Sequence, residues 1–461
     1  MDIQKSIFKI YIFLLPFLLL PGLANIKSMI SDSATVQNDL FILLIGITIF
    51  ILVKRGKIIF EKKYLYTDII SVCFKLVILS TVTSLLLFFP FGTVNGENTI
   101  TASIPNNIYM IITAMAFYYN AQMFKKISLE EIKKILDVLC IIMVVIGYFQ
   151  VVVLFIPSLG VFYDKLDFLG IFVDSSQLLR FGRICLAGSE PSSCGDIICI
   201  FLFPYILSKF ISGEEKKSII YIFLFLPLIF FTYSSTVYVG TVIDIILFFV
   251  FYLKEGKNIE GKRNFIIILF VSVFLFLIGG RFFLSNTPLG QKIYYFLFEK
   301  TSAVGSLSTE IRYSTLYVDG YAFLHYPITG VGNGNQGFFY NEVVREYLTK
   351  TALGYAEIAD RLNGNLGIVN GGAFVPAFIS GYGILGICIV YKYVKKSLIR
   401  LKKKKDLYEN FRYMYYIGAG SFLGLTFVSG NLDGNFIPIF VLSIPFLECM
   451  NEVNKSVEKV K

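Results

Sequence analysis

Two arginines and a carboxylate stand close together in residues 180–191, which read RFGRICLAGSEP. A guanidinium offers a planar fork of hydrogen-bond donors that fits phosphate or carboxylate oxygens, so Arg180 and Arg183 could bind an anion. Glu190 could then act as a general base or hold these arginines in place. A helix cap is the alternative interpretation of Glu190, because the proline after it is typical of a first helical position and the helix dipole favours an acid there.

A second set of candidates follows Arg312, where the chain carries His325 and a glycine-rich stretch. His325 is the only histidine in the sequence and could act as a base or as a hydrogen-bond donor to a ligand; the alternative is a histidine bonded to local backbone. Gly330 and Gly332 let the backbone bend tightly and approach a ligand closely. Because one histidine cannot build a histidine-rich site and neither DxD nor HExxH occurs, we expect no metal and no cofactor.

The elements that must position these residues are membrane helices. The chain of 461 residues is 56% hydrophobic and only 16% charged, with a mean hydropathy of +0.70, whereas soluble domains are about 25% charged. Apolar blocks near the length of about 20 residues that crosses a bilayer recur along it. They predict an all-α polytopic membrane protein with about twelve spans, at 7–24, 40–53, 69–90, 107–124, 135–156, 192–210, 218–233, 236–253, 264–280, 372–391, 411–429 and 436–449.

Most of the positive charge marks the topology of these spans. Basic residues concentrate at both termini and in five stretches at every second connection, which together hold 29 of the 42 Lys and Arg. The positive-inside rule therefore places both termini in the cytoplasm and the protein in the inner (cytoplasmic) membrane. The net charge of +10 is then no indication of a nucleic-acid partner. The five stretches are 54–63, 125–134, 209–217, 254–263 and 392–405.

Two connections on the predicted outer side are much longer than turns. They cover about 157–191 and 281–371, and long loops without membrane character are uncommon unless they fold over a site. The chain thus divides into 1–280 with nine spans, a large and partly helical extracytoplasmic loop at 281–371, and 372–461 with three spans and a cytoplasmic C-terminus.

The arginines are concentrated on this outer side. Six of ten Arg but only five of 32 Lys lie there, although a topology signal alone would treat the two types alike. An outer site for an anionic ligand is therefore one hypothesis, and pairing with acids of the same loops is the other. The six are Arg180, Arg183, Arg281, Arg312, Arg345 and Arg361.

A few polar residues within the spans have two interpretations each. Asp244 lies near the middle of the eighth span, where an ionisable group is costly and usually faces the bundle interior; a neutral, hydrogen-bonded carboxyl is the alternative. Asp196, one turn into the sixth span, is a weaker candidate of the same kind. Cys185 and Cys194 are the two cysteines placed to meet an oxidising exterior, so a disulfide between them stays open.

Several of these motifs together resemble the Wzy-type polymerases of O-antigen and capsular polysaccharide, within the O-antigen polymerase/ligase superfamily. The first motif is Arg183 followed by Glu-Pro-Ser at 190–192 at the start of a span. The others are Arg312 early in a long outer loop, PITGVG at 327–332 and NGGAFVPAFISGYGILG at 370–386. Related O-antigen ligases typically carry His-Asn just before the tenth span, where this chain has Val-Asn, which argues against a ligase.

The resemblance implies a GT-C-like fold and an inverting, metal-independent glycosyl transfer on the outer face of the membrane. The donor would be a glycan on a polyprenyl diphosphate, and the acceptor a hydroxyl of a second lipid-linked repeat unit. Arg183 and Arg312 would stabilise the leaving diphosphate, and Glu190, or else His325, would serve the acceptor hydroxyl. Partners would be that lipid-linked oligosaccharide and membrane lipids, with a chain-length regulator and a flippase as candidates. The implied substrate-binding residues are Arg180, Arg281, Arg345, Arg361, Gly330 and Gly332.

A lipid-linked-oligosaccharide flippase is the rival interpretation. A transporter should show two matched halves and charged residues along a central path. This chain instead places one long loop asymmetrically and keeps few charges inside its spans, so the polymerase is favoured.

Overall fold

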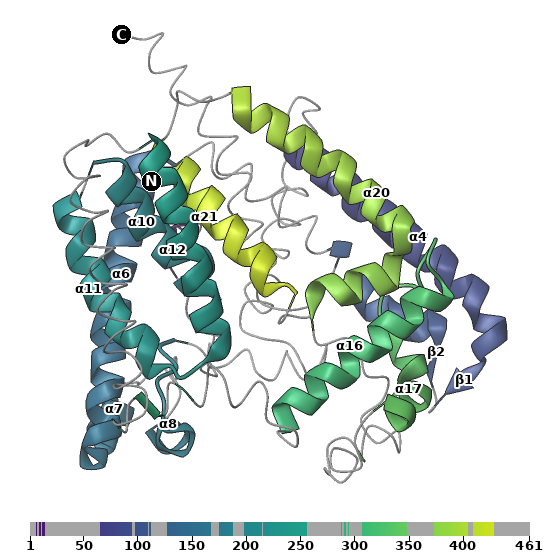
Figure 1. Cartoon of the computed structure of the whole chain (residues 1–461), viewed down its shortest axis with the longest axis horizontal. Helices are drawn as coiled ribbons and strands as arrows, with labels where there is room; N and C mark the ends of the chain where they lie inside the picture. The colour runs from purple at the N-terminus through teal and green to yellow at the C-terminus, as the bar shows by residue number, and fades with distance from the viewer. Residues whose placement is uncertain are drawn as a thin grey trace.

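The computed structural model of the chain (Figure 1) is predominantly helical in the residues it describes. The described residues are 65–94, 97–108, 127–166, 175–187, 198–213, 215–255, 307–347, 373–403 and 409–427, with single residues at 6, 9, 10, 12, 13, 110, 111, 287, 290, 291, 294 and 359. Within these ranges, the strands are β1 (Thr93–Val94) and β2 (Glu97–Asn98), a two-residue antiparallel hairpin.

Four helices are long and apolar enough to cross a membrane. They cover Ile70–Phe91, Glu130–Phe155, Thr236–Lys254 and Phe374–Lys396 and coincide with the predicted third, fifth, eighth and tenth spans. Shorter apolar helices at Ile198–Ile211 and Ser218–Phe231 match the sixth and seventh. A helical membrane protein is thus supported, and the count of twelve stays a prediction. Most of the predicted first, second, fourth, ninth and twelfth spans lies outside the described residues.

One group of helices packs around α21 (Figure 1). α21 contacts α10, α12 and the π-helical turn η2 that precedes α10, and α11 joins α6 to α10. A capping box starts α6, in which Ser128 and Glu131 each accept a hydrogen bond from the other's backbone N–H, as such boxes do at helix N-termini. Elements of this group are α6 (Leu129–Phe155), η2 (Ile198–Leu202), α10 (Phe203–Ile211), α11 (Glu215–Phe231), α12 (Ser235–Glu255) and α21 (Glu409–Leu425).

A second group is built on two long helices, α4 (Leu65–Phe91) and α20 (Phe374–Lys403), which lie side by side (Figure 1). From the predicted outer loop, α16 (Leu307–His325), the 3-10 turn η4 (Gln336–Phe339) and α17 (Tyr340–Tyr347) pack against each other, and α16 and η4 also contact α20. A separate small core joins these elements to α4 through Leu87, Val318, Ala322, Val331, Phe339, Tyr340, Val343 and Val344.

The shorter predicted outer loop is also partly helical. It contains a 3-10 turn at Pro157–Leu159, α7 (Gly160–Leu166) and α8 (Ser175–Phe181), all next to the end of α6. The Asp164 carboxylate accepts hydrogen bonds from the backbone and side chain of Ser175, at 2.7 and 2.6 Å. This contact ties the start of α8 to α7.

Candidate functional site

The tenth span is a broken helix rather than the continuous one that the apolar block predicts. Gly383 has φ 59° and ψ −161°, which interrupts α20. On the N-terminal side of the break, the carbonyls of Ser380 and Gly381 accept hydrogen bonds from the backbone N–H groups of Val331 and Gly332, both at 2.9 Å. The carbonyls that the break releases are therefore satisfied by another part of the chain.

The C-terminal side of the break is satisfied by the same part of the chain. The N–H groups of Ile384 and Leu385 donate to the carbonyls of Pro327 and Ile328, at 2.9 and 3.0 Å. Residues 327–337, here called the glycine segment, thus replace the helical hydrogen bonds that α20 lacks. Non-helical backbone at membrane depth is tolerated where protein satisfies its polar groups in this way.

The glycine segment also reaches far down the side of α4. The N–H of Asn333 donates to Ser80 Oγ at 2.9 Å, and Asn335 Nδ2 donates to Ser84 Oγ at 2.9 Å. Ser80 lies eleven residues before Phe91, where α4 ends, and at 1.5 Å per residue that is about 16 Å along the helix. Within the predicted loop 281–371, residues 327–337 therefore lie against two apolar helices, α4 and α20.

Gly330 and Gly332 are buried and adopt φ of 68° and 87°, which glycine does at little cost. A Cβ on Gly330 would overlap the backbone of Gly381 and Tyr382. A Cβ on Gly332 would instead overlap Ser84 Oγ of α4 and Asn335 Nδ2. The close approach that the structure shows is thus to α20 for Gly330 and to α4 for Gly332. A contact of these glycines with substrate stays a prediction.

A buried polar cluster connects α16, α20 and the glycine segment. Ser380 Oγ lies 2.9 Å from Asp319 Oδ1 and 3.1 Å from the carbonyl of Ala377, and Gln336 Nε2 donates to that same carbonyl at 2.8 Å. Asp319 and Gln336 are therefore connected by a chain of three hydrogen bonds. All four residues are buried, with Asp319 2% and Gln336 1% exposed.

Burial changes the acidity of Asp319. α16 belongs to the predicted outer loop, and desolvation of its Asp319 carboxyl raises the pKa from 3.8 to about 7, partly offset by the hydrogen bond from Ser380. Burial disfavours the charged form of an acid. This carboxyl therefore changes its charge near neutral pH.

Five buried side-chain oxygens of this region form no hydrogen bond with any residue that the structure describes: Asp319 Oδ2, Asn333 Oδ1, Asn335 Oδ1, Gln336 Oε1 and the Tyr382 hydroxyl. The acceptors around Asn335 fix which end of its amide carries the nitrogen. Nδ2 donates to both Ser84 Oγ and the Val331 carbonyl, so Oδ1 is the atom left without a partner. A buried acceptor without a donor costs about 1–3 kcal/mol. Sequence reasoning missed Asp319, Asn335 and Gln336, although the polar run NGNQ beside apolar spans was a usable signal.

The segment that carries Arg183 also lies against a membrane helix. Gln150, fully buried on α6, accepts hydrogen bonds from the N–H groups of Cys185 and Leu186, at 3.1 and 2.8 Å. Its amide nitrogen donates to the Leu186 carbonyl and the Tyr163 hydroxyl, at 2.8 and 2.9 Å. Residues 183–187, here called the arginine segment, are thus held by one glutamine. A lone amide in the apolar run YFQVVV was the signal for it.

Arg183 itself reaches the connection between α11 and α12, where its Nη1 donates to the Tyr233 carbonyl at 3.3 Å. Arg180 is exposed in the last turn of α8, and Arg345 is exposed in the last turn of α17. The backbone of Arg312 belongs to α16. The glycine segment and Arg312 thus belong to one helix group, and Arg183 and Arg180 to the other.

His325 ends α16 and is exposed. Its Nδ1 lies 3.0 Å from the Tyr321 carbonyl, and its ring centroid is 4.1 Å from that of Tyr321. A carbonyl only accepts, so a neutral imidazole carries its proton on Nδ1 and leaves Nε2 as an acceptor. The local backbone bond and a role as base are therefore compatible.

The remaining predicted residues lie outside the described part of the chain: Glu190, Arg281, Arg361, Asp196 and Cys194. Cys185 is buried, and its predicted pairing with Cys194 stays open. Among the described residues, no group of three or more His, Cys, Asp or Glu could hold a metal ion.

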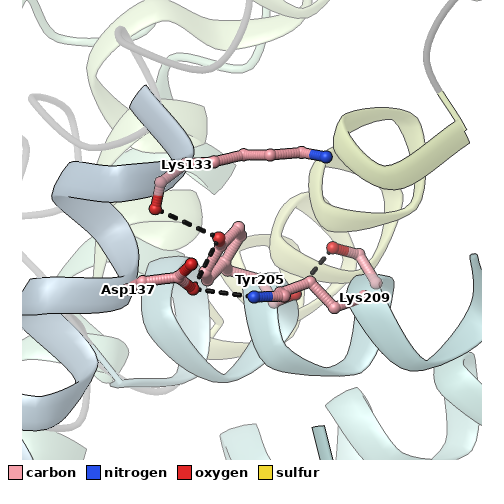
Figure 2. Close-up of polar contacts among 5 residues, drawn as sticks. Lys133, Asp137, Tyr205 and Lys209 are labelled. Atoms are coloured by element: carbon pink, nitrogen blue, oxygen red, sulfur yellow. Dashed lines mark hydrogen bonds and ion pairs between the residues drawn. The ribbon is translucent and has the colours of Figure 1, made fainter. Parts of the chain in front are cut away.

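Two further polar contacts lie inside the first helix group. Figure 2 shows Asp137 Oδ1 of α6 accepting from Lys209 Nζ and from the Tyr205 hydroxyl of α10, at 2.7 and 2.9 Å. Lys209 is 3% exposed, so it is a buried ion-pair partner and not only a topology charge. The Ser421 hydroxyl of α21 donates to Asp244 of α12, which is fully buried, as expected for an acid that faces the bundle interior.

Comparisons with known proteins identify no relative: no family model, no curated protein and no solved structure matches the chain.

Proposed function

We propose that the protein is a polysaccharide polymerase of the inner (cytoplasmic) membrane, with twelve spans and both termini in the cytoplasm. It joins polyprenyl-diphosphate-linked oligosaccharide repeat units by inverting, metal-independent glycosyl transfer on the outer face. The acceptor hydroxyl attacks the anomeric carbon of the donor sugar, and the bond from that carbon to the diphosphate oxygen breaks. The diphosphate leaves with the bonding electrons, and the hydroxyl proton passes to Glu190 or His325.

The observation that carries this proposal is the attachment of both motif-bearing segments to membrane helices. Gln150 of α6 holds the arginine segment, and the broken helix α20 holds the glycine segment that follows Arg312 and His325. A lipid-linked substrate keeps its tail in the bilayer and its diphosphate at the surface. Groups fixed to helices near the predicted outer surface suit such a substrate better than groups on a free loop.

The guanidinium groups supply the chemistry. Bidentate arginines stabilise the charge that develops on a leaving diphosphate without a metal ion. Arg183 and Arg312 take this role, while Arg180, Arg281, Arg345 and Arg361 bind the sugar phosphates and Gly330 and Gly332 shape the cavity.

Single substitutions Arg183→Ala, Arg312→Ala and Glu190→Ala test the proposal in a host whose surface polysaccharide depends on this protein. Each should collapse the ladder on a gel to a single repeat unit at unchanged protein level, whereas Lys254→Ala, an exposed change at the end of α12, should leave it intact. Full ladders from all three variants would refute the assignment. Loss of all surface glycan with lipid-linked units trapped inside would instead indicate a flippase.

The metal-independent step has a separate test. In a purified assay, chelation of divalent ions should leave the rate of glycan extension unchanged, because arginines carry the leaving-group charge. A rate that collapses on chelation and returns with Mg²⁺ would contradict it.

A further inference from the structure

The buried cluster at the break in α20 has an excess of negative potential. Asp319 Oδ2, Asn335 Oδ1 and Gln336 Oε1 lack hydrogen-bond donors among the described residues. The first half of α20 ends at Gly383, and the C-terminal end of a helix carries partial negative charge. Asp319 and Gln336 are both tied to the same turn of α20 through Ser380 and the Ala377 carbonyl, so the carboxylate and amide oxygens favour a positive charge in this region.

The described residues do not supply that positive charge. Ion pairs among them include those of Lys9 with Glu131 and of Lys209 with Asp137, and no described residue forms one with Asp319. Buried charges are normally paired or bound to a cation, since desolvation is otherwise too costly. A buried water could satisfy two of the oxygens, but it would leave the charge of an ionised Asp319 uncompensated.

We propose that this cluster binds one alkali-metal cation through Asp319 Oδ2 and Gln336 Oε1, with Asn335 supplying a further oxygen. One carboxylate with neutral amide oxygens suits a monovalent ion, whereas Ca²⁺ takes six to eight oxygens and usually several carboxylates. Interrupted membrane helices offer oxygen-rich surroundings of this kind to Na⁺. The bound ion joins α16, α20 and the glycine segment, and the inference does not depend on the proposed function.

Thermal unfolding of the purified full-length protein in detergent tests the proposal, with NaCl compared against choline chloride at equal ionic strength. At pH 8.5, above the pKa of about 7 of Asp319, saturating Na⁺ should raise the midpoint by roughly 2–4 °C over choline. Asp319→Asn, which keeps the size of the side chain but removes its charge, should abolish this difference. Gln336→Met should reduce it at least twofold.

The matched control is Asp244→Asn, on α12, at another buried acid of the described residues, whose Oδ2 likewise accepts no hydrogen bond from them. It should keep the whole Na⁺ response, because it lies in the other helix group. Equal midpoints for the wild type in Na⁺ and choline would overturn the proposal and leave water or a proton as the partner of these oxygens. A Na⁺ response that survives in Asp319→Asn would place the ion elsewhere and also overturn it.

Discussion

The arginine segment and the glycine segment both place non-helical backbone against apolar helices, but they differ in how many buried polar groups remain without hydrogen bonds. Both bring non-helical backbone against an apolar helix, α6 in one case and the α4–α20 pair in the other. Gln150 makes four hydrogen bonds, three to the arginine segment and one to Tyr163, and these use all of its own capacity. The glycine segment satisfies the backbone of the broken helix but leaves side-chain oxygens unpaired.

This difference separates structural support from capacity to bind. The Gln150 amide could bind a ligand only by breaking one of its existing hydrogen bonds. Its role is therefore to fix the backbone of the arginine segment. Unpaired buried acceptors lower stability unless something fills them. An added ion or hydrogen-bond donor would therefore stabilise the protein most if it bound to the unpaired oxygens around Asp319.

Gly330→Ala should have the largest effect on the side of the glycine segment. The new Cβ would overlap the backbone of α20 at a residue with φ of 68°, and backbone cannot move aside as a flexible side chain can. We expect a loss of more than about 4 kcal/mol, among the most damaging single changes, seen as loss of monodisperse protein in detergent.

Gly320→Ala is the matched control for that change. Gly320 lies within α16, and a Cβ there would meet nothing within 4 Å. Alanine in a helix interior should stabilise by about 0.5–1 kcal/mol. Equal yield and stability of the two variants would mean that the glycine segment does not pack on α20 as described.

Gln150→Leu should cause the next largest loss of stability, because it removes the hydrogen bonds that hold the arginine segment against α6. It leaves two N–H groups of the segment without their acceptor and the Leu186 carbonyl without its donor, for an expected loss of about 3–5 kcal/mol. Gln336→Leu gives the comparison and should cost only about 1–2 kcal/mol, since the oxygen it removes had no donor. Chemical denaturation in detergent measures both, and a larger loss for Gln336→Leu would reverse the contrast between the segments.

The sequence predicted part of this arrangement well. Long apolar blocks identify helices such as α4, α6, α12 and α20 because span length is set by the bilayer. The glycines Gly330 and Gly332 predict a place of close approach, and in the structure Gly330 approaches the backbone of α20. That contact joins residues about fifty positions apart, and hydropathy carries no information about such pairs.

Three other features could not be predicted from the sequence, each for a physical reason. The break at Gly383 is hidden because glycine within an apolar block does not interrupt its hydropathy. Lys209 was counted as a topology charge, since the positive-inside rule counts lysines without regard to a partner such as Asp137. Asp319 stood in a region assigned to a loop, where an acid calls for no explanation; only its burial against Ser380 gives it a role.

The charge of Asp319 should make the stability of the protein depend on pH. Its pKa is about 7 in the folded protein against 3.8 for the ordinary value, so the folded state binds more protons between these limits and stability falls as pH rises from about 4 to about 7. At 1.36 kcal/mol per pH unit the total loss is on the order of 4 kcal/mol at most. Unfolding in choline chloride at pH 5 and pH 8 measures the part of this loss above pH 5, about 3 kcal/mol.

Asp319→Asn isolates this contribution because it retains His325 and every other titrating group. Its stability should vary less with pH than that of the wild type, and above pH 7 in choline it should exceed the wild type. Parallel pH profiles for the two proteins would show that Asp319 does not titrate in this range.

The ion pair in Figure 2 should give smaller effects than Gly330→Ala or Gln150→Leu, because its charges are compensated within the protein. The Lys209 side chain is 4% exposed and that of Asp137 is 40% exposed, so the two partners are not equivalent. Asp137→Asn leaves a buried ammonium without its carboxylate and should cost about 2–3 kcal/mol, less than for a fully buried pair. Lys209→Met leaves a carboxylate that water can reach and should cost about 1 kcal/mol or less. Chemical denaturation at pH 7 measures the difference, and equal losses would mean that the lysine is solvated.

Because Asp137 is already paired with Lys209, neither variant should change the response of the unfolding midpoint to Na⁺, in contrast to Asp319→Asn.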